Sequence, residues 1–80
     1  MSLSSPRARS VDGAAFAIGI VAARFNGELV DALLARVTAG LRAAGVKAGR
    51  ITLVRVPGSH EVPWAAQALA RGRCDCVIGL

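Results

Sequence analysis

The chain has 80 residues, of which ten are Lys or Arg and five are Asp or Glu, giving a formal net charge of +5. A hydrophobic content of 54% excludes a disordered chain, and the length allows one small domain that buries about 60% of its unfolded surface. The basic residues form no run and have no aromatic residues between them. We therefore interpret them as solvated surface and expect no nucleic acid partner.

Cysteine usage and the start of the chain bear on location. Cys74 and Cys76 stand two apart and only one histidine is present, so a zinc site is implausible and we predict buried, reduced thiols and no metal. Reduced thiols are typical of the cytoplasm. No apolar run reaches transmembrane length, and residues 1–11 lack the apolar centre of a signal peptide. We expect a cytoplasmic protein with no membrane partner.

The N-terminal segment leads into the first predicted strand. Residues 1–14 are rich in Ser and Arg without periodicity, and we expect a flexible arm there, followed by a single domain over residues 15–80. Residues 15–22 (AFAIGIVA) are almost all apolar, which is typical of a strand covered on both faces of a parallel sheet. A polar turn follows at 23–27, where Asn26 is suited to cap the next helix.

A helix is predicted over residues 28–44, because apolar side chains recur at the three-four spacing of one helix face. That face carries Leu29, Val30, Leu33, Leu34, Val37 and Leu41. Gly45 has the usual position just after a helix end. Residues 51–56 form the second predicted strand, in which Arg55 interrupts an apolar face, as an edge strand would allow.

The segment 56–63 (VPGSHEVP) connects the second strand to a helix predicted over residues 64–71. Ser59 or His60 is expected to cap this helix, with Pro63 in its first turn. The helix is expected to face the sheet with its small and aliphatic residues, Val62, Ala65, Ala66 and Leu69.

The order strand, helix, strand, helix, strand predicts an α/β fold with three layers, α/β/α, around a parallel, flavodoxin-like sheet. The third strand, residues 74–80, has no turn or polar tail after it, so we expect the N-terminal part of a longer protein. In such sheets ligands bind beyond the carboxyl ends of the strands. The turns at 24–27 and 58–61 both fall at carboxyl ends.

The second of these turns could bind a small molecule or simply join two elements. Pro57 stops the strand, and Gly58 lets the backbone bend and approach a ligand closely. The Ser59 hydroxyl and the Glu61 carboxylate, at the positive end of a helix, suit a polyhydroxylated or anionic ligand. Alternatively, Glu61 only stabilises the helix dipole, by about 0.3–1 kcal/mol.

Three further side chains invite functional roles but also have structural explanations. Phe25 could stack on a flat heterocycle, or it could pack near Val30 as a hydrophobic staple. His60 could be catalytic, but its side chain would diverge from that of Glu61 by about 100° on a helix, and a surface or capping role is simpler. Trp64 suits packing or a subunit contact.

Three segments together resemble the lumazine synthase family: Phe25 with Asn26, then 56–63, then 77–80. The resemblance covers residues 15–80 in order and spacing, and the combination is specific. It implies an enzyme of riboflavin biosynthesis that condenses 5-amino-6-(D-ribitylamino)uracil with 3,4-dihydroxy-2-butanone 4-phosphate. The implied product is 6,7-dimethyl-8-ribityllumazine, and the implied reaction uses no cofactor and no metal.

The resemblance also implies a substrate-binding site, made of Phe25, Asn26, Gly58, Ser59, His60 and Glu61. The Phe25 ring would stack on the pyrimidine. The second turn, with His60 acting through its backbone, would hold the ribityl chain and the pyrimidine edge. The acid/base histidine and the phosphate-binding residues of the family would lie beyond Leu80, so no catalytic residue is assigned within this chain.

The resemblance further implies a homo-oligomer, either a pentamer or an icosahedral shell of pentamers, whose contacts would cover apolar surface. Two other functions remain open: a non-catalytic flavin- or pterin-like binding module that uses the same crevice, and a shell-assembly protein with a vestigial site. Formation of the lumazine by the complete chain would separate the enzyme from both.

Overall fold

The computed structural model describes residues 12–80, so the arm predicted for residues 1–11 lies outside the described part. The elements run in the order β1 (Ile18–Ala23), α1 (Gly27–Ala43), β2 (Ile51–Val56), α2 (Val62–Ala70) and β3 (Cys76–Gly79). Two short 3-10 turns, η1 (Ala48–Arg50) and η2 (Ser59–Glu61), precede β2 and α2. Near the expected end of the arm, Gly13 is buried and its N–H donates to the carbonyl of Ala44 at 2.6 Å.

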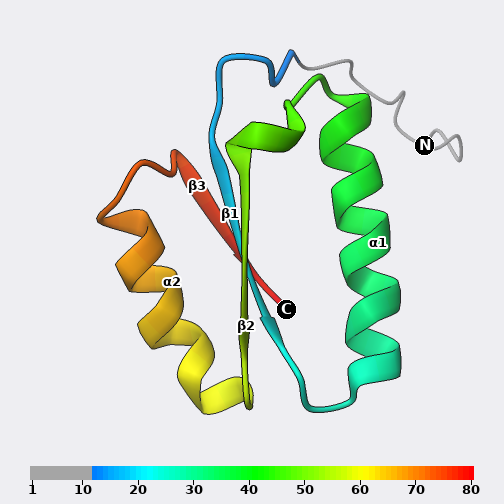
Figure 1. Ribbon diagram of the computed structural model, residues 1–80, viewed down its shortest axis with the longest axis vertical. Helices are drawn as coiled ribbons and strands as arrows, with labels where there is room; N and C mark the ends of the chain where they lie inside the picture. The colour runs from blue at the N-terminus through cyan, green and yellow to red at the C-terminus, as the bar shows by residue number, and fades with distance from the viewer. Residues whose placement is uncertain (1–11) are drawn as a thin grey trace, which may run out of the picture.

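The three strands form one parallel sheet, as predicted (Figure 1). Their order in the sheet is β2-β1-β3. Every residue of β1 is buried, which confirms a central strand covered on both faces. The strand begins at Ile18, three residues later than expected. Just before the strand, the Ala17 N–H donates to the Asp75 carboxylate at 2.8 Å, and the Ala17 carbonyl accepts from the Asp75 N–H at 2.7 Å.

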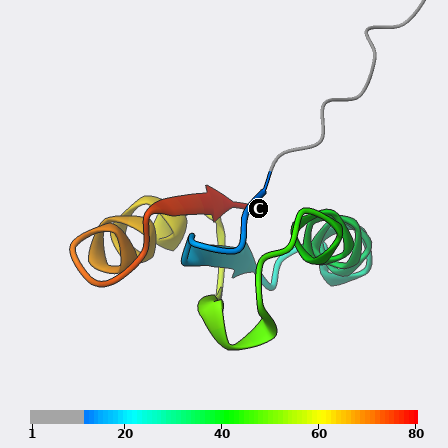
Figure 2. The same cartoon turned by 90° about the horizontal axis from the view of Figure 1, so that it is seen from above.

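The two helices cover opposite faces of the sheet (Figure 2), which confirms the three-layer arrangement. Val21 and Ala23 of β1 pack with α2, whereas Ile18 and Ile20 pack with α1. Gly19 lets α2 lie close, since a Cβ there would stand 3.0 Å from the Cδ1 atom of Leu69. The fold class predicted from the sequence is therefore the observed one.

Helix α1 has almost the predicted bounds and ends before Gly45, whose φ of 95° is a conformation that favours glycine. Val30 is buried, and the next residues facing the sheet are Leu34, Val37 and Leu41. The prediction was wrong for Leu29 and Leu33, which are exposed. At 3.6 residues per turn, Leu29 points about 100° away from Val30, outside the face that the sheet covers.

Helix α2 begins at Val62, directly after η2, and its N-cap is Glu61 without a side-chain capping hydrogen bond. The expected cap by Ser59 or His60 is wrong, because both lie within the preceding 3-10 turn. Pro63 lies in the first helical turn as predicted. Ala65 is buried between helix and sheet, and the residues packed beside it are Val62, Ala66 and Leu69.

Trp64 and the two cysteines are less buried than core residues. The Trp64 side chain is 74% exposed, which does not fit packing within residues 12–80, and a subunit contact stays a prediction. Both cysteines are free, but Cys76 is exposed and Cys74 only half-buried, rather than both being core thiols. The cause is the position of β3, which is an edge strand of the described sheet. Within residues 12–80, no helix is both long and apolar enough to cross a bilayer.

Candidate functional site

Two turns lie side by side at the carboxyl edge of the sheet. Ala23 and Val56, the last residues of β1 and β2, are partners in the parallel register. Directly after them, the Arg24 N–H donates to the carbonyl of Val56 at 2.8 Å. Both helices therefore start at the same end of the molecule, the lower end in Figure 1. The structure thus brings together the two turns that the sequence marked as candidates.

The first turn, residues 24–26, presents an aromatic ring and an amide. Asn26 adopts a left-handed conformation with φ of 56°, which Asn tolerates better than most residues. It is the N-cap of α1 as predicted, but its side chain makes no capping hydrogen bond, so the amide is available to a ligand. Phe25 is 72% exposed. That exposure does not fit a hydrophobic staple, which would bury the ring beside Val30.

The second turn places Glu61 over the backbone of Gly58. Gly58 has φ of −153° and ψ of 179°, an extended conformation open to any residue, so the expected need for glycine to bend the chain is wrong. A Cβ at this position would lie 3.8 Å from the Oε2 atom of Glu61, an ordinary contact. The missing side chain therefore leaves the backbone beside the half-buried carboxylate open to close approach.

Ser59 and His60 complete the second turn as exposed residues of η2. No side-chain hydrogen bond between residues of the described chain involves either of them, so Ser59 has no base partner. The described residues also contain no group of three His, Cys, Asp or Glu placed to hold a metal ion. The arrangement is suited to binding and orienting a ligand through stacking, hydroxyl and carboxylate contacts.

Sequence reasoning missed an ion pair directly beneath the two turns. The Nη1 atom of Arg55 donates to the Oδ1 atom of Asp31 at 2.8 Å, joining β2 to α1. As predicted, Arg55 lies on an edge strand. The available signal was an arginine on an apolar strand face together with an acid on the helix that crosses to that strand.

The comparisons with known proteins agree with one another. Residues 15–80 match the family model described as 6,7-dimethyl-8-ribityllumazine synthase. The chain belongs to this family. It is similar to proteins of that name from Kineococcus radiotolerans, with 46% identity over 70 residues, and from Salinispora arenicola, with 47% identity over 75 residues. Another relative of the same name, from Pyricularia oryzae, is 45% identical over 69 residues.

The match covers most of this chain but less than half of each relative. The aligned regions are 88%, 94% and 86% of this chain and 42%, 43% and 34% of the relatives in the same order. The chain therefore spans about two fifths of the length of the first two lumazine synthase relatives. Both candidate turns lie inside the matched region.

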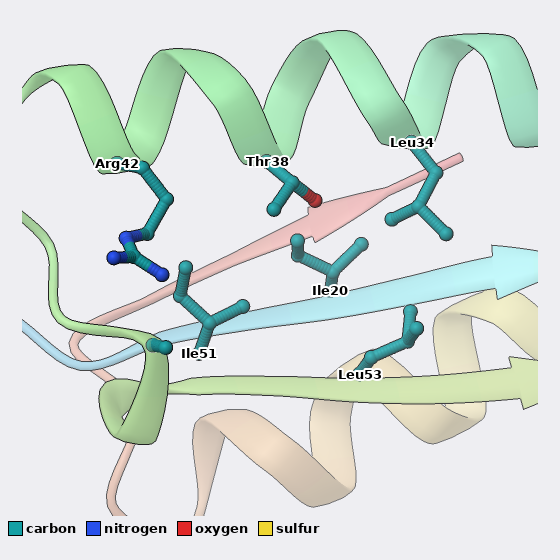
Figure 3. Close-up of a pocket in the computed structure, with 7 residues that line it drawn as sticks. Ile20, Leu34, Thr38, Arg42, Ile51 and Leu53 are labelled. Carbon is teal, nitrogen blue, oxygen red and sulfur yellow. The ribbon is translucent and has the colours of Figure 1, made fainter.

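An apolar groove lies elsewhere on this member of the lumazine synthase family, between α1 and the adjoining face of the sheet (Figure 3). Its volume is about 210 Å³, and its lining residues are Ile20, Leu34, Thr38, Arg42, Ala48, Ile51 and Leu53. None of the candidate residues lines it. The groove belongs to the contact between α1 and the sheet and not to the candidate site.

Proposed function

We propose that this chain supplies the pyrimidine- and ribityl-binding turns of a lumazine synthase. The complete enzyme would condense 5-amino-6-(D-ribitylamino)uracil with 3,4-dihydroxy-2-butanone 4-phosphate to give 6,7-dimethyl-8-ribityllumazine in riboflavin biosynthesis. Membership of the family supports the proposal. The observation that carries it is the pairing of Ala23 with Val56, which sets an exposed Phe25 and a half-buried Glu61 on neighbouring strand ends.

The residues of the two turns would divide the work of binding. The Phe25 ring would stack on the flat pyrimidine, and the Asn26 amide would contact the same substrate. The Glu61 carboxylate would accept hydrogen bonds from hydroxyl groups of the ribityl chain, which passes over Gly58. Ser59 would contribute its hydroxyl and His60 its backbone.

Orientation of two substrates is the main catalytic contribution proposed for these turns. The reaction would proceed by Schiff-base formation, loss of phosphate and ring closure, and it needs no nucleophile from the protein. Holding two reactants in geometry for attack can supply much of the rate enhancement. Proton transfer and phosphate binding would fall to residues that the relatives carry outside the matched region, and neither a cofactor nor a metal is required.

We further propose a homo-oligomer, a pentamer or an icosahedral shell, located in the cytoplasm. An assembly is supported by large apolar side chains that are exposed on the described chain. They are Phe16, Phe25, Leu29, Leu33, Leu53 and Trp64. Sedimentation velocity of the purified full polypeptide would distinguish a pentamer from a shell. A monomer at micromolar concentration would contradict this part of the proposal.

Product formation by the purified full polypeptide tests the enzymatic function. Its intact mass, measured under denaturing conditions, first establishes whether the polypeptide extends beyond Leu80. The two substrates are then mixed with the protein, and the product is monitored by its fluorescence. Tight binding of the ribitylaminouracil without any product would favour a binding module. Unchanged activity in Glu61→Ala, together with lost oligomers, would favour an assembly protein.

A further inference from the structure

The Arg55 side chain links β2, β1 and α1 near the carboxyl ends of the strands. Its Nη1 atom donates to Asp31 Oδ1 at 2.8 Å, and its Nη2 atom donates to the carbonyl of Ala23 at 3.4 Å. The Arg55 side chain is only 25% exposed, while that of Asp31 is 64% exposed. One guanidinium therefore contacts the end of β1 and the second turn of α1 from the neighbouring strand β2.

These contacts hold both ends of the first ligand-binding turn. Ala23 is the last residue before the turn at 24–26, and Asp31 lies after it on α1. Phe25 stands at the centre of the turn. Arg55 is followed by Val56, the last residue of β2, and then by the turn that carries Glu61. The Arg55 side chain therefore links the Phe25 turn to the strand from which the Glu61 turn starts.

Stability alone is a poor explanation for an arginine at this position. Its Nε atom is buried and has no hydrogen-bond partner among the described residues, and an unpaired buried donor is destabilising. An apolar residue would continue the face formed by Ile51 and Leu53. Departures from local packing rules of this kind concentrate at functional sites.

We propose that Arg55 is a positioning residue for the pyrimidine substrate. It acts through Ala23 and Asp31 to fix the Phe25 turn at the correct distance from the Glu61 turn. Asp31 is its partner in this role. The inference rests on the proposed function, since it takes the Phe25 turn as the place where the pyrimidine stacks.

Direct titration of 5-amino-6-(D-ribitylamino)uracil into the full polypeptide by calorimetry tests this role separately from turnover. Arg55→Met keeps the length and apolar stem but removes both contacts, and we expect its Kd to rise roughly ten- to a hundred-fold. Arg55→Lys retains the charge but cannot make both contacts at once, so its Kd should be intermediate. Arg36→Met, an exposed change of the same kind on α1, is the matched control and should bind like the wild type.

Hydrogen exchange supplies a readout of turn geometry that needs no activity. The Arg24 N–H bonds to the Val56 carbonyl and the Val30 N–H bonds to the Asn26 carbonyl, so both amides should exchange faster in Arg55→Met and Asp31→Asn. The exchange of the Ala65 amide, in α2 where it packs against the sheet, should stay unchanged. Faster exchange at all three amides would indicate general destabilisation and overturn a positioning role.

The outcomes are distinguishable from failure of the proposed function. A raised Kd with faster local exchange supports the inference, whether or not the wild type forms the lumazine. An unchanged Kd in Arg55→Met overturns it even if the wild type is an active enzyme. A wild type that does not bind the ribitylaminouracil overturns both the inference and the proposed function.

Discussion

Substitution of Gly58 by Ala separates what the fold needs at the second turn from what a ligand would need. The backbone there is extended, and an added Cβ would meet only the Glu61 Oε2 atom, at 3.8 Å. The protein should therefore tolerate the methyl group, and reduced freedom of the unfolded chain should stabilise it by about 0.4–1 kcal/mol. Thermal unfolding of Gly58→Ala should give an unchanged or slightly higher Tm.

A ligand that lies against the Gly58 backbone would be displaced by the same methyl group. Insertion of a methyl into a filled space costs about 1–3 kcal/mol. Since a factor of ten corresponds to about 1.36 kcal/mol, the Kd for the ribitylaminouracil should rise roughly 5- to 160-fold. Calorimetric titration measures this change directly, and steady-state kinetics should show a matching rise in KM.

The matched control is Gly49→Ala in η1, at the amino end of β2 and away from both turns. A Cβ there would have no atom within 4 Å, so the Tm should change as little as in Gly58→Ala, unchanged or slightly higher, while the Kd should stay that of the wild type. Two results would refute the reasoning. A Tm lowered by Gly58→Ala would mean that the turn itself requires glycine, and an unchanged Kd would mean that the ligand does not approach this backbone.

Three further substitutions test the ring, the contact of α2 with the sheet and the core. Phe25→Ala should change the free energy of unfolding by less than about 0.5 kcal/mol, because the ring is exposed. It should raise the Kd for the ribitylaminouracil roughly 2- to 13-fold through lost stacking. Unchanged affinity in calorimetry would contradict the stacking role. Gly79→Ala would bring a Cβ to 2.9 Å from the Val62 Cγ1 atom, so urea unfolding should show a loss of about 1–3 kcal/mol, and no loss would mean that α2 shifts freely. Ile20→Val removes one methylene from a fully buried side chain and should cost about 0.5–1.5 kcal/mol in the same assay, whereas a neutral result would place Ile20 outside the well-packed core.

Much of the fold could be predicted from periodicity and from turn residues. The apolar spacing of residues 28–44 gave the bounds of α1 to within about one residue, and β2 runs over the predicted residues 51–56. Gly45 has the left-handed conformation that its position after a helix indicates. The positions of the two candidate turns could be inferred from the alternation of strands and helices, because parallel strands place their carboxyl ends at one edge.

The remaining features depend on contacts between distant parts of the chain. One such contact is the hydrogen bond from the Ala17 N–H to the Asp75 carboxylate, 58 residues away, just before β1. Periodicity places Leu29 on the apolar side of α1, but it does not show how much of that side the sheet covers. The ion pair between Arg55 and Asp31 could not be predicted for the same reason, because the pattern of residues along one strand does not reveal a partner on a helix.

The register between β1 and β2 determines how far apart the two candidate turns lie. Side chains alternate along a strand, so a slip of one residue would move β2 by about 3.3 Å and turn its α2-facing Val54 and Val56 toward α1. The hydrophobic burial that stabilises the sheet therefore also fixes the register of β2 and with it the spacing of the two turns. A molecule with the wrong register would lose this burial and would not fold stably, so every folded molecule has the same spacing between the two candidate turns.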